Sequence, residues 1–456
     1  MRPYGFRLTF TALWGCIVMS PLLAHADTVA FPDAEGAGKF TKGGRGGDVY
    51  HVTSLEDSGA GSFRDGIESI DGPRTIVFDI SGTIRLKKDV KIKDISHLTI
   101  AGQTAPGKGI TFADRGLVFK GCSHIVIRYL RIRIGDENKI EKVSTDAIMI
   151  NDSDHIILDH LSLSWGIDGN GDFRGLKNTT LQWLIFSEGL NDSGLHYENN
   201  PHAMASSFRD PEGQATLHHN IYATSRHRHP STAGGAHVFE FVNNVDFNWS
   251  TGQNISGEQF NLINNYYRAG PMNKGRLPLQ YKTKEPQPVS RGYFAGNYFD
   301  GLPDKYNSDN LSAINFEAFG SKYRGTTRNF FAASKRFDAG KYRLTKIETA
   351  HEAYKSCLRQ SGCSLARDTV DDRLIKSIIN KTGKVIDSQK EVGGWDIYPS
   401  VARPAGFDTD QDGMPDAWER KLGLNPNDPA DGNKDHNNDG FTNCEEYINS
   451  LTQLSK

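Results

Sequence analysis

The sequence predicts an all-β solenoid, a right-handed parallel β-helix, followed by a helical C-terminal extension and a small calcium-loop module. Three observations predict it. Short strand-like runs recur from about residue 75 to 300, an asparagine recurs beside the later ones, and two acidic loops stand near the end of the chain. Stacked coils can use some 430 residues in one unit, although that length exceeds one ordinary domain.

The first 26 residues are expected to be a signal peptide. Arg2 and Arg7 precede an apolar run, and Ala24-His25-Ala26 has the small-residue pattern of a cleavage site. The run is too short and too interrupted to span a membrane, and no later segment is long enough. We therefore expect a secreted protein, extracellular or periplasmic, with no membrane partner.

The charge of the mature chain excludes one class of partner. Without the leader's two arginines, 51 Lys and Arg face 55 Asp and Glu, which gives a net charge of about −4. Proteins that bind the phosphate backbone normally carry a basic surface. We therefore expect no nucleic-acid partner, and we expect a monomer.

The strand signals are β-branched and apolar runs with Gly, Asn or Asp at their ends, such as TIVFDI, HIVIRYLRIRI and HIILDHLSL. The matching positions Ile100, Ile127, Leu158 and Leu181 lie 27, 31 and 23 residues apart. Such an irregular period fits coils that must stack because none buries a core alone. An antiparallel sandwich would show turn signals about every 8 to 12 residues instead.

Asparagine recurs three places after an apolar residue in the second half of this region. The pairs are Leu217/Asn220, Phe241/Asn244, Leu262/Asn265 and Phe294/Asn297. A turn preference could explain any single asparagine. Four in register favour a ladder, in which each side-chain amide bonds backbone groups at the same corner of successive coils.

The chain divides into four expected parts: a leader (1–26), the β-helix (27–345), a helical extension (346–400) and paired calcium loops (401–456). In the extension, ETAHEAYKSCL and DTVDDRLIKSIINKTG have the apolar spacing of short helices that pack on the solenoid.

Four cysteines remain after the leader. Cys357 and Cys363 are close enough in sequence to pair in an oxidising compartment. Cys122 lies in a strand pattern and is expected to be a buried thiol, with Cys444 left over.

Two segments beyond the linker-like Arg403-Pro404-Ala405-Gly406 match the twelve-residue calcium loop. The expected ligands are Asp408, Asp410, Asp412, Met414 (backbone carbonyl), Asp416 and Glu419 in the first loop, and Asp435, Asn437, Asp439, Phe441 (backbone carbonyl), Asn443 and Glu446 in the second. Because VARPAGF is no helix, paired loops of the dockerin or thrombospondin type fit better than a full EF-hand. We expect a structural or adhesive role.

Three central segments carry the chemistry: LDHLSLSWGIDG, LQWLIFSEGLND and HHNIYATSRHRHP. Together they resemble the pectate lyases, and the resemblance covers roughly residues 30 to 395. It implies a calcium-dependent enzyme that cleaves pectate, a (1,4)-linked α-D-galacturonan of plant cell walls, by β-elimination.

On this resemblance Arg228 takes the place of the family's catalytic arginine. Asp168, Glu188 and Asp192 take the places of its calcium-binding carboxylates, and Asp146 is a further candidate. Asp168, Glu188 and Asp192 have an alternative interpretation as caps of turns and strand ends.

The family's second basic residue after the proline is replaced here by Ser231. Substrate must therefore be held by other residues, for which Arg226, Arg209 and His202 are candidates. Trp165 is a candidate for stacking on sugar, with burial as the alternative.

The chemistry of a uronate supports this set of residues. Removing the proton at carbon 5 builds up negative charge beside a carboxylate, and a hard cation with oxygen ligands can withdraw that charge. A guanidinium with a pKa above about 12 is a poor base. Proton acceptance by Arg228 is thus what the resemblance implies, whereas stabilisation of the enolate follows from charge alone.

Other interpretations stay open. Arg228 could be a solvated surface arginine, and His160 and His219 are expected to be core or ladder histidines rather than metal ligands. The acidic residues could serve a β-helix glycoside hydrolase, and the lyase could act on another uronate polysaccharide. A non-catalytic adhesin that binds polysaccharide is the third alternative.

Overall fold

The computed structural model describes residues 28–138, 144–198, 201–235, 238–257, 259–281, 291–316, 328 and 331–453. The expected signal peptide lies outside these ranges. Within them, no helix combines the length and the apolar character needed to cross a membrane.

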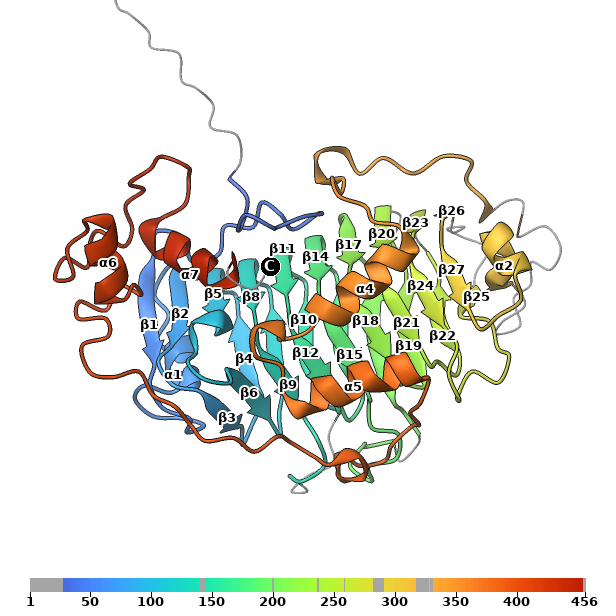
Figure 1. Ribbon diagram of the computed structural model, residues 1–456, viewed down its shortest axis with the longest axis horizontal. Coiled ribbons are helices and arrows are strands. Elements are labelled where there is room, and N and C mark those ends of the chain that lie inside the picture. Colours follow the sequence, from blue (N-terminus) through green and yellow to red (C-terminus); the bar gives the residue numbers. More distant parts are fainter. Residues whose placement is uncertain are drawn as a thin grey trace, which may run out of the picture.

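The strands from β2 to β28 cycle in order through three parallel sheets, so that each coil adds one strand to each sheet. Figure 1 shows the resulting parallel β-helix, which confirms the predicted fold. Sheet 1 comprises β1 (Asp48–Val52), β2 (Arg74–Phe78), β5 (Ser96–Ala101), β8 (Ser123–Arg128), β11 (Asp154–Asp159), β14 (Lys177–Gln182), β17 (Ala215–His218), β20 (Val238–Val242), β23 (Gln259–Ile263) and β26 (Arg291–Ala295). Sheet 2 comprises β3 (Gly82–Arg85), β6 (Ile110–Ala113), β9 (Arg131–Arg133), β12 (Ser162–Ser164), β15 (Ile185–Ser187), β18 (Ile221–Ala223), β21 (Val245–Phe247), β24 (Tyr266–Arg268) and β27 (Tyr298–Asp300). Sheet 3 comprises β4 (Val90–Lys93), β7 (Leu117–Lys120), β10 (Ile148–Asn151), β13 (Gly169–Arg174), β16 (Met204–Arg209), β19 (His227–Ala233), β22 (Gly252–Ile255), β25 (Leu279–Tyr281) and β28 (Ile314–Asn315).

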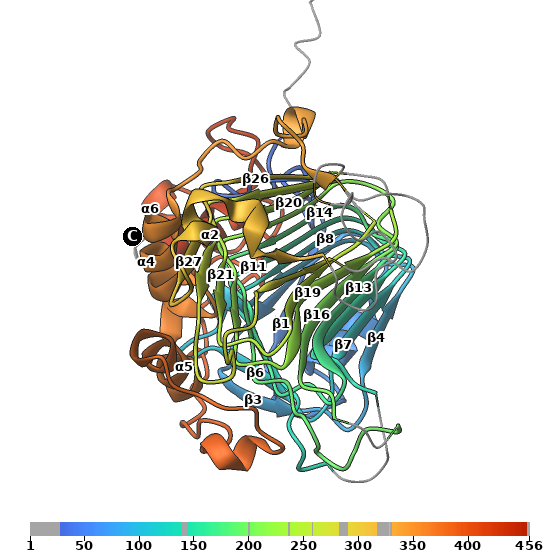
Figure 2. The ribbon, with the colours of Figure 1, turned by 90° about the vertical axis from the view of Figure 1, so that its right-hand side faces the viewer.

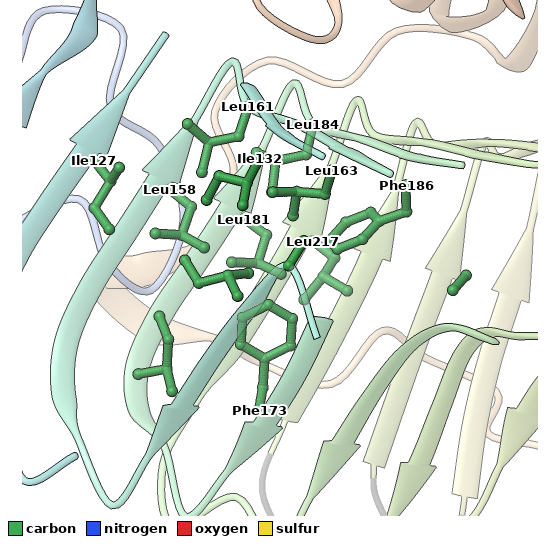
Figure 3. Close-up of a cluster of buried hydrophobic side chains, with 14 of the residues drawn as sticks. Ile127, Ile132, Leu158, Leu161, Leu163, Phe173, Leu181, Leu184, Phe186 and Leu217 are labelled. Carbon is green, nitrogen blue, oxygen red and sulfur yellow. The ribbon is translucent and has the colours of Figure 1, made fainter. Parts of the chain in front are cut away.

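Apolar side chains form columns along the interior. In sheet 1, Ile127, Leu158, Leu181, Leu217 and Phe241 pair in register, and all five are fully buried. Figure 3 shows part of this column beside side chains from the other two sheets. Each buried leucine contributes roughly 1.5–3 kcal/mol. The two apolar series noted in the sequence are therefore one continuous column.

The predicted asparagine ladder is confirmed. The backbone N–H of Asn220 donates to the Oδ1 of Asn244 at 2.9 Å, Asn244 donates in the same way to Asn265, and Asn265 to Asn297. Asn310 extends the ladder by one step, because its Oδ1 accepts the N–H of Asn297 at 2.9 Å. The sequence pattern missed Asn310 because it lies in the 3-10 helix η2 and not after a strand.

The two helices expected in the extension are present. Helix α4 (Ala350–Gln360) starts with a capping box formed by Thr349 and Glu352, and α5 (Thr369–Asn380) starts at Asp368, whose side chain caps it. Both pack on sheet 2 through Leu374 and its neighbours. The remaining helical elements are α1 (Phe63–Glu68), η1 (Gly102–Thr104), α2 (Lys305–Ser308), η2 (Asn310–Ala313), η4 (Gly340–Tyr342), η5 (Ser364–Ala366), η6 (Gln389–Val392), α6 (Asp416–Leu422) and α7 (Asn443–Gln453).

The expected pairing of Cys357 with Cys363 is wrong for this structure, in which both thiols are free and buried. The Sγ of Cys357 instead faces the carbonyl oxygen of Asn243 at 3.4 Å. Cys122 is a buried thiol in the solenoid interior, as expected. Cys444 is buried where the tail meets the solenoid.

The acidic tail packs on the N-terminal end of sheet 1. Met414 and Tyr447 join Val77 of β2 in one apolar cluster, and Glu445 pairs with Arg45 at 2.8 Å. The linker-like segment is bonded to the solenoid as well, since the N–H of Arg403 donates to the carbonyl of Asp79 at 2.7 Å. The tail is thus docked on the β-helix rather than held by a free linker.

The three outer faces of the solenoid differ in how they are covered. Residues 28–45 and α7 lie on sheet 1, and α4 and α5 lie on sheet 2. Figure 2 shows these helices on one side of the molecule and the strands of sheet 3 on the other, with no described helix over them. The outer face of sheet 3 is therefore the open surface of the fold.

Candidate active site

A polar pocket lies on the open face of sheet 3, where β10, β13, β16 and β19 are neighbours. Its volume is about 210 Å³. It adjoins a second hollow of about 500 Å³ that also contains Arg226, and the two share His202, Arg209 and Arg228. The smaller pocket is lined by Asp146, Asp168, Asp172, His196, Tyr197, Glu198, His202, Met204, Arg209 and Arg228.

Strand register brings the three aspartates together. Ile148 of β10 pairs with Gly171 of β13, so Asp146, two residues earlier, stands beside the start of β13. A Cβ on Gly169 would lie 2.7 Å from the Oδ1 of Asp146, so glycine leaves space for that carboxylate. Asp168 and Asp172 share the outer face, because side chains on a strand alternate.

Asp146 is buried in the pocket beside two other carboxylates. Burial raises the pKa of Asp146 well above its usual range, and the carboxylates of Asp168 and Asp172 raise it further. Asp172 accepts hydrogen bonds from Ser207 and from Arg209, and Asp168 accepts one from the hydroxyl of Ser144 at 2.8 Å. A cation among the three carboxylates would relieve the repulsion at Asp146.

Arg228 faces this acidic cluster from β19. Its guanidinium makes no hydrogen bond or salt bridge with any residue that the structure describes, and its positive charge lowers the pKa of Asp146 against the larger upward effects. The next residue, His229, is fully buried. Its ring nitrogens contact Asp246 at 2.7 Å and the carbonyl of Ser225 at 2.9 Å. These contacts of His229 fix the backbone next to Arg228, whereas the Arg228 side chain remains free to contact a ligand in the pocket.

Asp168, His196 and His202 also offer ligand atoms within 4.8 Å of one another. The Nδ1 of His196 accepts the backbone N–H of Glu198 at 3.2 Å, so the neutral ring carries its proton on Nε2. That nitrogen has no lone pair for a metal in this arrangement. Within this group, Asp168 and His202 are then the residues left to bind a cation.

Two predicted carboxylate ligands do not join Asp168. Glu188 is buried, and its oxygens accept hydrogen bonds from Arg373 at 2.6 and 2.7 Å and from the indole N–H of Trp165 at 3.1 Å. Asp192 is exposed and stands beside Asp387, whose carboxylate accepts its backbone N–H. Neither residue lines the pocket, so the predicted grouping of Asp168 with Glu188 and Asp192 is corrected to Asp168 with Asp146 and Asp172.

Of the two interpretations of Trp165, burial is confirmed. Its ring is fully buried and contacts Trp395 edge to face, so it cannot stack on a sugar. The histidine predictions hold. His160 and His219 belong to a column of stacked rings with Tyr129 and Trp183, with neighbouring centroids 4.2 to 5.9 Å apart.

Sequence reasoning missed five residues of the pocket: Asp172, His196, Tyr197, Glu198 and Met204. Asp172 had a signal, since it lies four residues after Asp168 in a strand and so faces the same side. His196, Tyr197 and Glu198 come from a loop with no periodic pattern. Tyr197 is 57% exposed at the pocket.

The first tail loop holds a second acidic cluster. Asp408, Asp410 and Asp412 form one group of possible ligands, and Asp412, Glu419 and Asp431 form another. Buried oxygens of Asp410, Asp412, Glu419 and Asp431 have no hydrogen-bond partner among the described residues. Burial raises the pKa of Asp408 to about 6, of Asp412 to about 7 and of Glu419 to about 8.

The loop template is only partly right. Asp416 turns away from the cluster and binds Thr409 and Arg420, whereas Asp431, twelve residues after the end of the template at Glu419, turns into it. As the sequence indicated, no helix lies directly before the first loop, in the described residues 393–407. Helix α6 begins inside the loop, at Asp416.

The second loop is less compact. The carboxylate of Asp435 accepts the N–H groups of Asp439 and Gly440, and Asn437 donates to Glu446. Asn443 is buried and donates to the carbonyl of Asp431. The expected carbonyl ligands Met414 and Phe441 stay predictions. Met414 is fully buried, and the ring of Phe441 lies under Arg45.

Comparison with known sequences identifies close relatives of the whole chain. It is 33% identical over 431 residues to a probable pectate lyase C of Emericella nidulans, covering 93% of each protein. It is equally similar to the probable pectate lyase C of Aspergillus fumigatus, over 93% of this chain and 94% of that one. A pectate trisaccharide-lyase of Thermotoga maritima matches 44% of the chain at 29% identity. No family model matches the sequence.

Among solved structures, the chain is similar to Jun a 1, the major allergen of cedar pollen. The TM-score is 0.51 at 17% identity, and the match covers 72% of this chain and 92% of that one. This likeness supports the fold.

Proposed function

The chain belongs to the pectate lyase family, and we propose that it cleaves pectate by β-elimination at the pocket on sheet 3, with calcium as cofactor. The observation that carries the proposal is the arrangement of Asp146, Asp168 and Asp172 opposite Arg228 on the outer face of sheet 3, which no described helix covers. The reaction removes the proton at carbon 5 of a uronate, forms a double bond between carbons 4 and 5, and expels the oxygen at carbon 4.

The three aspartates fit a calcium ion. They offer only oxygen ligands. Burial raises the pKa of Asp146, and the carboxylates of Asp168 and Asp172 raise it further, so a bound cation would favour its ionised form. Asp146, Asp168 and Asp172 would hold the ion, and its charge would stabilise the negative charge that develops beside the substrate carboxylate.

Arg228 is proposed to act on the reacting sugar. It has no partner among the described residues to draw its guanidinium away, and the buried ring of His229 fixes the backbone behind it. It would stabilise the negative charge that develops when the carbon 5 proton leaves, and accept that proton if the resemblance to the family extends to this step.

Other groups around the pocket would bind the sugar chain. Arg226, Arg209 and His202 line the two hollows and are proposed to bind uronate carboxylates and hydroxyls. Arg209 takes over the task of the basic residue that Ser231 replaces, since it lies one coil earlier on the same face.

We also propose that the protein is secreted as a monomer after removal of residues 1–26. Residues 27–345 would form the catalytic solenoid and 346–400 its helical cover. The tail from residue 401 would bind calcium for structural reasons, with Asp431 in the set of ligands in place of Asp416.

An ultraviolet assay on polygalacturonate tests the proposal. The unsaturated uronide absorbs, so absorbance should rise with added calcium, stop in excess chelator and return when calcium is restored. New reducing ends without absorbance would instead indicate a hydrolase, and unchanged polymer would indicate a binding protein.

A further inference from the structure

We propose that a row of basic residues on sheet 3, running from the catalytic pocket toward the N-terminal coils, is a remote binding site for a polyuronate chain. The basic row consists of Lys93, Lys120, Arg174 and Arg209. The inference rests on the proposed function, because it assigns further contacts to the same polymer.

Strand register aligns the basic row. Lys93 of β4 pairs with Lys120 of β7, Lys120 with Asn151 of β10, Asn151 with Arg174 of β13, and Arg174 with Arg209 of β16. Neighbouring strands lie about 4.8 Å apart, so the row runs for roughly 19 Å along the solenoid axis. Its last member, Arg209, is a wall of the pocket.

The two ends of the basic row differ in their partners. Arg209 pairs with Asp172, and Arg174 pairs with Asp210 at 3.2 Å. Lys93 and Lys120 are exposed and form no salt bridge with any residue in the described ranges. The same holds for Lys91, which occupies the other outward position of β4.

The nearby aspartates are directed elsewhere. Directly after each residue of the row, the chain turns through a residue with a positive φ. This residue is Asp94 in the first coil, Gly121 in the second, Asp152 in the third and Gly175 in the fourth. A Cβ on Gly121 would lie 2.4 Å from the Oδ1 of Asp94, and one on Gly175 would lie 2.7 Å from that of Asp152. Each carboxylate thus covers the glycine of the next coil instead of the lysines.

Placing like charges directly opposite each other on neighbouring strands is unfavourable. Lys93 and Lys120 carry this cost on an open sheet face that leads into a site for an anionic sugar. Beyond Arg209, the next position of the same row is the neutral Ala233 of β19. A polyuronate carries one carboxylate on each sugar. The basic row places cations that can bind these carboxylates on the side of the pocket that faces the N-terminal coils.

The double variant Lys93→Gln/Lys120→Gln tests the inference, with Lys355→Gln/Lys376→Gln as the matched control. The control lysines are equally exposed but lie on α4 and α5, over sheet 2. We expect the KM for polygalacturonate to rise about three- to tenfold in the test variant, the scale of two exposed ion pairs, with kcat unchanged. The rise should be smallest for trigalacturonate and grow with oligomer length, and KM should depend less on salt.

Retention in a gel that contains polygalacturonate gives a readout independent of turnover, and it should fall in the test variant alone. Unchanged retention and KM, or an equal rise in KM for substrates of every length, would overturn the inference. Absence of unsaturated product from the wild-type protein would instead count against the proposed function. The melting temperature should stay level or rise at low salt, because a repulsive pair is removed; a fall would show that the lysines serve the fold.

Discussion

The pocket on sheet 3 and the first loop of the tail are both clusters of carboxylates, but they differ in the cations around them. In the pocket, Arg209 and Arg228 stand against Asp146, Asp168 and Asp172. In the tail, no described lysine or arginine pairs with Asp410, Asp412, Glu419 or Asp431, and the cluster is closed by the protein. A cluster that retains arginines and an open side can receive an anionic substrate. A closed cluster without arginines has room for a metal ion but not for a substrate.

The largest expected effect comes from Arg228→Lys. The substitution keeps the charge but loses the planar guanidinium, so a role in the chemical step should lower kcat by about 10² to 10⁴. Steady-state rates at saturating polygalacturonate measure this. Arg226→Lys is the comparison variant: Arg226 is proposed to bind the sugar chain and not to act on the reacting carbon, so this variant should raise KM and keep kcat. If Arg228→Lys keeps near-normal turnover and mainly raises KM, the residue only binds substrate.

The tail cluster should govern stability and not turnover. In the calcium-free protein, the pKa values of Asp412 and Glu419 are about 7 and 8, above their usual 3.8 and 4.5. The folded state then holds protons that the unfolded chain has released, so stability should fall as pH rises from about 4 to 8. At a free concentration one hundred times its Kd, calcium should restore about 2.7 kcal/mol. Melting curves at pH 5 and 8, with calcium or chelator, measure both effects.

A matched pair of tail variants sharpens this result. Glu419→Gln should weaken the response of the melting temperature to calcium, whereas Asp416→Asn should leave that response in place, because Asp416 turns away from the cluster. Equal effects of the two variants would show that Asp416 is a ligand, as the twelve-residue template predicts, and would contradict its replacement by Asp431.

Removing the tail separates the two regions. We expect a chain that ends before Arg403 to keep its kcat at low temperature, because the pocket lies on a different sheet. It should melt earlier, because Val77 and Ala101 lose the cover of Met414 and Tyr447. Loss of turnover in a folded truncated protein would show that the tail contributes to the active site.

A smaller effect on activity is expected for Glu188→Gln. The substitution leaves Arg373 without its carboxylate partner, and we expect a loss of about 1–3 kcal/mol in the free energy of unfolding. The calcium concentration for half-maximal activity should not change. Denaturant unfolding and a calcium titration of the rate distinguish this result from a ligand role for Glu188.

The sequence predicted the features that repeat along the chain. The column through Leu158 and Leu181, the asparagine ladder and the helices of the extension all follow from short-range periodicity, which each coil imposes on the next. Asp172 could have been found in the same way, from its spacing to Asp168.

The errors concern contacts between residues far apart in sequence. Glu188 is drawn from the pocket by Arg373, which lies 185 residues later on α5. Asp431 enters the tail cluster from beyond the twelve-residue template. No local pattern indicates which distant side chain satisfies a carboxylate, so the choice between a metal ligand and a salt-bridge partner required the structure.

The most direct test of this account is a calcium titration of lyase activity in Asp172→Asn beside Asp192→Asn, followed by the ultraviolet absorbance of the product from polygalacturonate. Asp172 belongs to the pocket and Asp192 does not, although both are acidic and near Asp168 in sequence. We predict that Asp172→Asn raises the calcium concentration for half-maximal activity about tenfold or more, the scale of one lost charged ligand, and that Asp192→Asn leaves it unchanged. The reverse result would contradict the assignment of the calcium site to sheet 3.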